Sequence, residues 1–284
     1  MFEMVDLCDY LGCETVVTIN NLEDPEDMGD FVEYAWGDAS TKWGSQRIAD
    51  GHPEVYNVSW IECGNEQGLD NVLLYTCGNI TAAMDARSKA IGAPLFRYAI
   101  GHNLQAGELG NPILVDFLNL FKPYGDRMYW DWHIGSGETG PQESEDAMMQ
   151  FKALVDSVGS EMRWVCFEEN GWDHDLLRGI GHAAFSMMYA RHGDFAPVQG
   201  FADAIQAWQG MNAEQNFPQG ALFTFPNMTF LQPPGHVIRM LSESKRPKLL
   251  GSVLNSGNTT GLDAVAIGNA DGSGVILRVV NWSP

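Results

Sequence analysis

Residues 57–66 read NVSWIECGNE, a largely apolar run that ends in a glycine, an amide and a carboxylate. An apolar run without strict alternation is typical of a strand that is covered on both faces, as in a parallel sheet. A glycine directly after such a run indicates a turn. The stretch therefore predicts a buried parallel strand with Asn65 and Glu66 at its carboxyl end.

Similar runs recur along the chain at regular spacing. Further strands are predicted at 14–20, 94–99, 127–133, 163–168 and 200–208. With the strand at 57, successive starts lie 43, 37, 33, 36 and 37 residues apart, which is the length of one βα unit. Helical patterns occupy the gaps, and they are clearest at 25–37, 143–158 and 176–191, with an amphipathic helix at the amino end.

This array predicts an α/β protein of the (β/α)8 TIM-barrel type. Only six units are found, whereas a closed barrel has eight, and an open array would leave unpaired sheet edges. We therefore expect the chain to start partway into a longer protein and to lack the first two units.

A different pattern begins at about residue 248, where short apolar runs alternate with Gly, Asn and Ser. The segment NADGSG at 269–274 reads as a hairpin turn between two such runs, which indicates antiparallel structure. The predicted domains are a partial catalytic barrel at 1–247 and the beginning of a β-sandwich at 248–284.

Composition narrows the range of partners. The 284 residues are 45% hydrophobic, enough for a large core, and 37 acidic against 16 basic residues give a net charge of −21. Such a field repels nucleic acids and anionic membranes but leaves neutral sugars unaffected. The five cysteines show no metal-ligand spacing. No apolar run could span a bilayer, and five glycosylation-type patterns leave a secreted location open.

Charged side chains gather where the predicted strands end. Glu66 follows one strand, Glu168 and Glu169 end another, and Asp131 and His133 end a third. Carboxyl ends of barrel strands converge on one face, and Glu66 and Glu168 are 102 residues apart, or three units. Two facing carboxylates, one protonated and one ionised, are what glycosidic bond cleavage requires.

Ordinary structural roles compete with this interpretation. A single glutamate after a strand is more often a first-turn helix residue, and a lone histidine such as His133 is usually structural. Strand alternation lets only one of Glu168 and Glu169 point into the barrel, and Glu62 could be a partner beneath Glu66. Tryptophans near strand ends, where a sugar could stack, are Trp43, Trp132 and Trp172.

The stretch 33–66, EYAWGDASTKWGSQRIADGHPEVYNVSWIECGNE, closely resembles the family 51 glycoside hydrolases, the α-L-arabinofuranosidases. RMYWDWHIG at 127–135 resembles the sixth barrel strand of that family, and WVCFEENGW at 164–172 resembles its nucleophile strand. The resemblance implies a barrel with a β-sandwich, and retaining hydrolysis that releases terminal arabinofuranosyl groups from arabinan or arabinoxylan. It implies an arabinose-containing polysaccharide or oligosaccharide as partner and no cofactor or metal, and it leaves a homo-oligomer open.

The resemblance also implies individual roles. Glu66 is similar to the acid/base and Glu168 to the nucleophile. Asn65 is similar to the amide that binds the sugar 2-hydroxyl, and His133 to the histidine that contacts the nucleophile. The remaining substrate-binding candidates are Asn20, Trp172 and Gln206.

Two departures from the family pattern keep alternatives open. Gly135 stands where the family has tyrosine, and Glu169 stands where it has tryptophan or tyrosine. A like charge beside Glu168 would raise the pKa of that nucleophile. A truncated or impaired member that at most binds carbohydrate is one alternative, and a hydrolase for a xyloside or a β-glucan is another.

Overall fold

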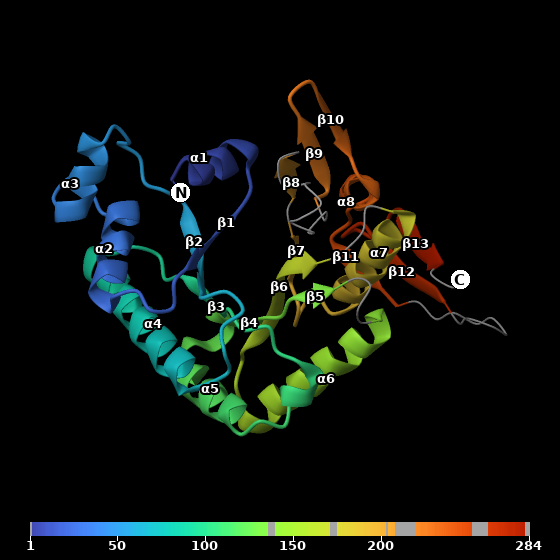
Figure 1. Cartoon of the computed structure of the whole chain (residues 1–284), viewed down its shortest axis with the longest axis horizontal. Coiled ribbons are helices and arrows are strands. Elements are labelled where there is room, and N and C mark those ends of the chain that lie inside the picture. Colours follow the sequence, from blue (N-terminus) through green and yellow to red (C-terminus); the bar gives the residue numbers. More distant parts are fainter. Residues whose placement is uncertain are drawn as a thin grey trace. The chain divides into compact units, whose positions relative to one another are not determined.

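The computed structural model describes residues 2–135, 140–170, 175–202, 204–207, 220–251 and 261–281. The chain forms two compact units. Unit 1 comprises Met1–Asp131 and Phe151–Arg163, and unit 2 comprises Trp132–Gln150 and Trp164–Pro284. Figure 1 shows the elements of both, coloured along the sequence.

Unit 1 is built on four parallel strands that neighbour one another in chain order. They are β1 (Thr15–Ile19), β2 (Val58–Cys63), β3 (Arg97–Ile100) and β4 (Met128–Asp131). The four predicted strands of this region are therefore confirmed, although β3 starts three residues later than its predicted start at 94 (97 − 94). The preceding helix ends at Gly92 with a left-handed φ of 73°, so residues 93–96 are needed to return the chain to the sheet.

Helices precede and follow these strands along the chain (Figure 1). They are α1 (Phe2–Leu11), α2 (Pro25–Trp36), α3 (Lys42–Ala49), α4 (Asn71–Ile91) and α5 (Ile113–Phe121), with 3-10 turns at η1 (Ala106–Glu108) and η2 (Lys122–Arg127). The predicted helix at 25–37 is confirmed as α2. Its N-cap Asp24 accepts a hydrogen bond from the Glu26 amide, which satisfies one of the free donors of the first turn.

A buried arginine joins α2 to α3. The Arg47 guanidinium, on α3, donates to the backbone carbonyls of Tyr34 (2.8 Å) and Gly37 (2.9 Å) at the end of α2. The last carbonyls of a helix have no partner within the helix and carry partial negative charge. Arg47 thus satisfies them and fixes the angle between the two helices.

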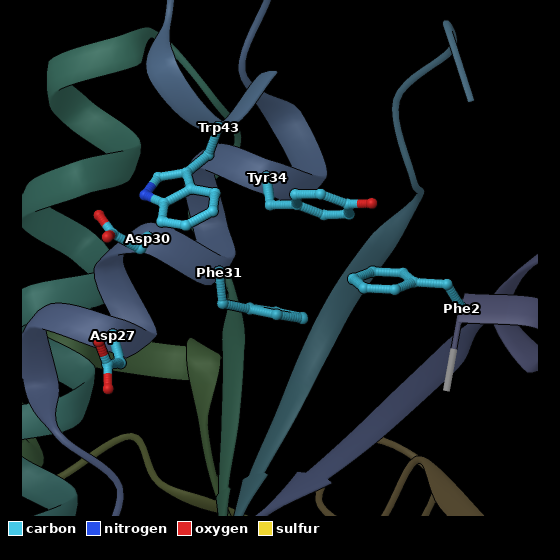
Figure 2. A pocket seen from close by; sticks show the side chains of 6 residues that line it. All are labelled: Phe2, Asp27, Asp30, Phe31, Tyr34 and Trp43. Carbon is cyan, nitrogen blue, oxygen red and sulfur yellow. The ribbon is translucent and has the colours of Figure 1, made fainter. Parts of the chain in front are cut away.

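Helix α1 packs on α2 through aromatic rings. The Phe2 ring lies 5.0 Å from that of Tyr34 and 4.4 Å from that of Tyr56. Beside them is a hollow of about 270 Å³, and Figure 2 shows its side chains. Two of its polar groups are paired within the protein, since Asp30 lies 3.0 Å from Arg87 and the Tyr34 hydroxyl donates to Asp50. We assign the hollow to the packing of α1, α2 and α3.

Unit 2 has a parallel sheet with β6 (Arg163–Asn170) at its centre, between β5 (Ile134–Gly135) and β7 (Val198–Phe201). Helix α6 (Pro141–Val158) and β6 each have residues in both units. Helix α7 (Leu176–Arg191) joins β6 to β7 and has the bounds that the sequence predicts. The predicted helix at 143–158 is confirmed with two further residues at its start.

The prediction of one strand at 200–208 is wrong. The structure has β7, which ends at Phe201, and a separate β8 (Ile205–Ala207) that pairs with β9 (Leu222–Phe225) in another sheet. β9 continues into the antiparallel β10 (Met228–Leu231), and α8 (Pro233–Glu243) follows. The chain turns at Ala202 after β7, which breaks the apolar run into two strands.

The predicted antiparallel region is confirmed. It consists of β11 (Lys248–Leu250), β12 (Leu262–Gly268) and β13 (Val275–Asn281), with β12 in the middle. The hairpin turn falls where predicted, with the Asn269 amide donating to the Gly274 carbonyl at 3.3 Å. The domain boundary between 247 and 248 stays a prediction.

The β12–β13 hairpin shares a core with α7. Val265, Ile267 and Val280 pack with Ala184 and Met187 of the helix. A small antiparallel sheet is stable in water when it has a covered hydrophobic face, and the contact with α7 covers these side chains of β12 and β13. Within the described residues, no helix has the length and apolar character to cross a membrane.

This packing can be tested with Ile267→Ala. The side chain is 5% exposed, so its truncation leaves a cavity and should lower the free energy of unfolding by about 2–5 kcal/mol. Leu277→Ala is the matched control, because Leu277 lies on the neighbouring strand but is 62% exposed. Urea unfolding of both variants measures the difference, and equal losses would contradict the shared core.

Candidate active site

Unit 1 places a tight turn at the carboxyl end of β2. The Gly64 amide donates to the carbonyl of Ile19, at the end of β1, at 2.8 Å. The Gln67 amide donates to the carbonyl of Gly101, after β3, at 3.0 Å. The turn is therefore hydrogen-bonded to the ends of both neighbouring strands, and it presents Glu66 exposed at this edge of the sheet.

Glu66 has an unusual backbone conformation. Its φ is 51°, and across the described ranges no other non-glycine residue has a positive φ. Such a conformation costs about 1–3 kcal/mol and is found where surrounding structure enforces it, often at active sites. Asn65, which precedes it, is also exposed. Unit 1 thus presents an amide and a carboxylate together, in a strained turn at the carboxyl end of a parallel strand.

Gly101 makes room for this turn. A Cβ atom at residue 101 would lie 2.1 Å from the carbonyl oxygen of Gly64. The two backbones can approach only because residue 101 is a glycine.

Gly101→Ala should therefore displace the turn that holds Glu66. Overpacking of this kind costs about 1–3 kcal/mol, and hydrogen exchange at the Gln67 amide should become faster. Gly107→Ala is the control, since a Cβ at that position would meet nothing within 4 Å. Unchanged exchange at Gln67 in Gly101→Ala would show that the turn does not depend on the close approach.

The structure adds His102, which the sequence analysis did not single out. It is buried at the carboxyl end of β3, with Nδ1 2.5 Å from the Gln67 carbonyl and Nε2 3.2 Å from Glu108. His102 thereby supports the segment that follows Glu66. A signal was present, because His102 lies two residues beyond an apolar run that the structure extends to Ile100.

Two other residues of the sequence analysis lie near the same edge. Asn20 follows β1 and is exposed, and its side-chain oxygen accepts a hydrogen bond from the Leu22 amide at 3.0 Å. Glu62 is buried within β2 and accepts a hydrogen bond from the Thr18 hydroxyl at 2.5 Å. Asn20 is thus positioned with Asn65 and Glu66 at strand ends, while Glu62 is tied to β1.

Unit 2 brings together Glu168 and His133. Nδ1 of His133 lies 3.5 Å from Oε2 of Glu168, with the histidine side chain 2% exposed and the glutamate side chain 33% exposed. Glu168 is near the carboxyl end of β6, and His133 immediately precedes β5. A half-exposed carboxylate beside a buried imidazole can be held in one orientation and still reach a ligand.

The pairing of β6 with β7 is irregular at Glu168. Cys166 is opposite Gln199 and Glu169 is opposite Phe201, so Phe167 and Glu168 together face only Gly200. A bulge of this kind turns a side chain out of the regular alternation and is common next to active sites. Gly200 permits it, because a Cβ there would lie 2.8 Å from the Phe167 carbonyl oxygen.

Glu169 is wholly buried and has its own partners. Its Oε1 accepts a hydrogen bond from Arg178 at 2.9 Å, and its Oε2 contacts Nδ1 of His182 and accepts from Gln199 at 2.7 Å. The extra acid beside Glu168 is thus balanced by a buried arginine and a histidine. Of the two consecutive glutamates, Glu168 is the one beside His133.

These contacts decide the charge of Glu169. Burial alone would raise its pKa, but the attraction of His182 and Arg178 outweighs it, so the pKa lies below the ordinary value of 4.5. A carboxylate with a lowered folded-state pKa stabilises the fold above its unfolded pKa. That stabilisation is lost as the pH falls through the lowered value.

Glu169→Gln should therefore destabilise unit 2 in a pH-dependent way. Removing one partner of a buried ion pair costs about 3–5 kcal/mol, and this loss should be complete at pH 7. The difference in unfolding free energy between wild type and variant should narrow as the pH falls below 4.5, where the unfolded chain takes up a proton at Glu169, and should vanish once the pH passes the lowered folded-state pKa. Denaturant unfolding at pH 7 and at a pH below 4.5 measures this difference in unfolding free energy. A difference that is the same at both pH values would refute the assignment of a charged, buried Glu169.

The remaining predicted residues are placed as follows. Gln206, on β8, is buried, and its Oε1 accepts a hydrogen bond from the Gly220 amide at 2.8 Å. Trp132 is buried with its ring stacked 4.2 Å from that of Trp164, so its side chain belongs to the core. Trp43 borders the hollow of Figure 2. Trp172 lies outside the described residues.

Comparisons with known proteins point to arabinofuranosidases. Residues 1–93 match the family model described as the alpha-L-arabinofuranosidase 1 domain. Alpha-L-arabinofuranosidase 2 of Arabidopsis thaliana is 23% identical over 94% of this chain, and probable alpha-L-arabinofuranosidase A of Aspergillus awamori is 24% identical over 78%. This chain is therefore similar to α-L-arabinofuranosidases over most of its length.

Solved arabinofuranosidase structures share its fold. The enzyme of Thermotoga maritima, in complex with arabinose, matches 98% of this chain with a TM-score of 0.75 at 20% identity. The GH51 enzyme of Thermotoga petrophila matches 99% with a TM-score of 0.77 at 20% identity. The shared fold agrees with the predicted TIM-barrel class. This chain spans 38% of the Arabidopsis relative, 32% of the Aspergillus relative, and 63% and 64% of the two solved chains.

Proposed function

We propose that this chain carries the two reacting carboxylates of a retaining glycoside hydrolase that releases terminal α-L-arabinofuranosyl residues from arabinan- or arabinoxylan-type polysaccharides. The observation that carries the proposal is a pair of side chains, half-exposed Glu168 near the end of β6 and buried His133 beside it. The strained, exposed Glu66 at the end of another parallel strand supports it. The choice of arabinofuranose as the sugar follows the names of the relatives, which are arabinofuranosidases.

The reaction follows from the chemistry of the two carboxylates. Ionised Glu168 attacks the anomeric carbon while protonated Glu66 gives its proton to the leaving oxygen, and the glycosidic C–O bond breaks. Glu66, now ionised, takes a proton from water, and the water oxygen displaces Glu168 from the anomeric carbon. Arabinose leaves with retained configuration, and both carboxyl groups return to their starting states.

This mechanism requires a particular distance between the two carboxyl groups. Glu66 belongs to unit 1 and Glu168 to unit 2, and retention requires their carboxyl groups about 5–5.5 Å apart, against about 6.5–9.5 Å for inversion. Asn65 would bind the sugar 2-hydroxyl, and His133 would orient Glu168. Asn20, Trp172 and Gln206 are proposed to complete the substrate-binding surface.

The proposal extends to the finer architecture. The parallel strands are proposed to be part of a (β/α)8 barrel, and β11, β12 and β13 to be strands of a β-sandwich. The likeness to arabinofuranosidase structures over nearly the whole of this chain supports this assignment. A barrel joined to a sandwich would place the barrel at 1–247 and the sandwich from 248 onward.

Two variants separate the roles of the carboxylates. Glu168→Ala should abolish turnover of both an aryl α-L-arabinofuranoside and a natural oligosaccharide. Glu66→Ala should lower kcat/KM on the oligosaccharide by about 10²- to 10⁴-fold but spare an aryl substrate whose leaving group needs little protonation. Glu161→Ala is the control, because Glu161 is exposed and precedes β6 at the opposite end of that strand.

The same assay addresses the alternatives. No turnover by the unmodified chain would favour an impaired relative that at most binds carbohydrate. Turnover of aryl xylosides or glucosides in place of arabinofuranosides would change the substrate class. An NMR spectrum of the first-formed product that shows inverted anomeric configuration would exclude the retaining mechanism.

A further inference from the structure

Unit 2 contains a buried group of charged side chains that the proposed reaction does not use. It comprises Glu169 on β6, Arg178 and His182 on α7, and Gln199 on β7, and we call it the Glu169 cluster. Glu169, Arg178 and His182 are 0%, 2% and 4% exposed. Burying charges is costly even when they are paired, so the fold gives up stability to keep this cluster next to Glu168.

The cluster fixes the backbone of β6 as well as a side chain. One arm of the Arg178 guanidinium donates to the Glu169 carboxylate, and the other donates to the Glu169 backbone carbonyl at 3.2 Å. The Ala202 amide donates to the same carbonyl at 3.2 Å. Residue 169 is thus held through both its side chain and its main chain by α7 and by the end of β7.

An aromatic ring closes the cluster. The Arg178 guanidinium lies 4.5 Å from the centroid of the Phe201 ring, and the His182 ring meets Phe201 edge-on at 4.9 Å. Phe201 is also the residue opposite Glu169 in the sheet. Arg178 and His182 therefore both pack against Phe201, which limits the orientations available to their side chains.

The contacts that hold Glu169 also limit the conformation of the neighbouring Glu168. The Phe167–Glu168 bulge adds conformational freedom just before Glu169, and the regular pairing resumes at Glu169 itself. Residues 168 and 169 share a peptide bond, so holding both the side chain and the carbonyl of Glu169 limits the backbone conformations open to Glu168. The Glu168 carboxylate then stays beside His133, whose Nδ1 lies 3.5 Å away.

We propose that the Glu169 cluster is a positioning device, which anchors the end of β6 to α7 and so aims Glu168 at the substrate. This inference rests on the proposed function, because it assigns the cluster to the same reaction. Glu169, Arg178 and His182 are positioning residues, since none of them is proposed to touch the sugar.

The chain offers a matched control. Glu145 on α6 binds Arg191 at 2.8 Å and His192 at 2.6 Å, at the other end of α7. It is again a carboxylate that joins an arginine and a histidine, in the same unit, but it does not adjoin Glu168 in the chain or in the sheet. Glu145→Gln removes a comparable charge without loosening the end of β6.

The experiment compares kcat and KM of wild type, Glu169→Gln and Glu145→Gln on an aryl α-L-arabinofuranoside, below the unfolding temperature of each. A misdirected nucleophile should lower kcat of Glu169→Gln by about 10- to 100-fold, with KM within about 3-fold of wild type. Glu145→Gln should keep kcat within about 3-fold. Full kcat in Glu169→Gln, or an equal loss in both variants, would overturn the proposal.

A second variant covers the case in which Glu169→Gln does not fold. Glu169→Gln combined with Arg178→Met removes the buried cation that the single change leaves uncompensated, so the double variant should regain stability. It still lacks the anchor, and its kcat should stay about 10- to 100-fold below wild type. Recovery of wild-type kcat in the stable double variant would show that the cluster serves stability alone.

A readout without turnover separates this inference from the proposed function. If the wild type does not hydrolyse the arabinofuranoside, the proposed function fails, and the positioning of Glu168 is then judged from the His133 ring by ¹⁵N NMR. Its resonances should shift in Glu169→Gln, because Glu168 moves relative to Nδ1, and stay in place in Glu145→Gln. His133 signals that are unchanged in Glu169→Gln would refute the positioning role by themselves.

Discussion

The need to keep one carboxylate charged in the absence of water organises unit 2. Glu169 has no exposed surface, so the fold must supply it with cations and donors in place of hydration. Arg178 and His182 do this from α7, and Gln199 does it from β7. Three elements are thereby joined around a single side chain, and the neighbouring Glu168 takes its direction from them.

Helix α7 extends this principle along its length. Its amino-terminal half carries Arg178 and His182, which hold β6, while Arg191 at its end binds Glu145 on α6 and Asp263 on β12. Between these polar ends, Ala184 and Met187 pack against the hairpin. One helix therefore connects the parallel strand β6, the sheet of β11, β12 and β13, and α6 within unit 2, with polar contacts at its ends and apolar contacts in the middle.

Much of this arrangement could be predicted from the sequence. The regular spacing of apolar runs located β1, β2, β4, β6 and α7, because buried strands and amphipathic helices leave periodic patterns in the sequence. The strand ends then pointed to Glu66 and Glu168.

What failed has physical reasons. The run at 200–208 looks continuous, but the chain turns after β7, and pairing partners far away in sequence decide that break. Strand alternation predicted that only one of Glu168 and Glu169 points into the barrel. It could not predict which one is buried, because the partners that decide this lie on the following helix. His102 escaped notice because β3 starts and ends later than the pattern suggested.

The shared core of α7 and the hairpin bears on how such proteins diverge. Val265, Ile267 and Val280 pack on α7. The same helix carries Arg178, which binds Glu169. Exchanging the carboxyl-terminal strands for those of another protein would leave this stripe of α7 facing a surface shaped for a different helix. The strands and α7 are therefore expected to be inherited as one block, and a recombination point inside that block would be selected against even though it lies far from Glu168 in the sequence.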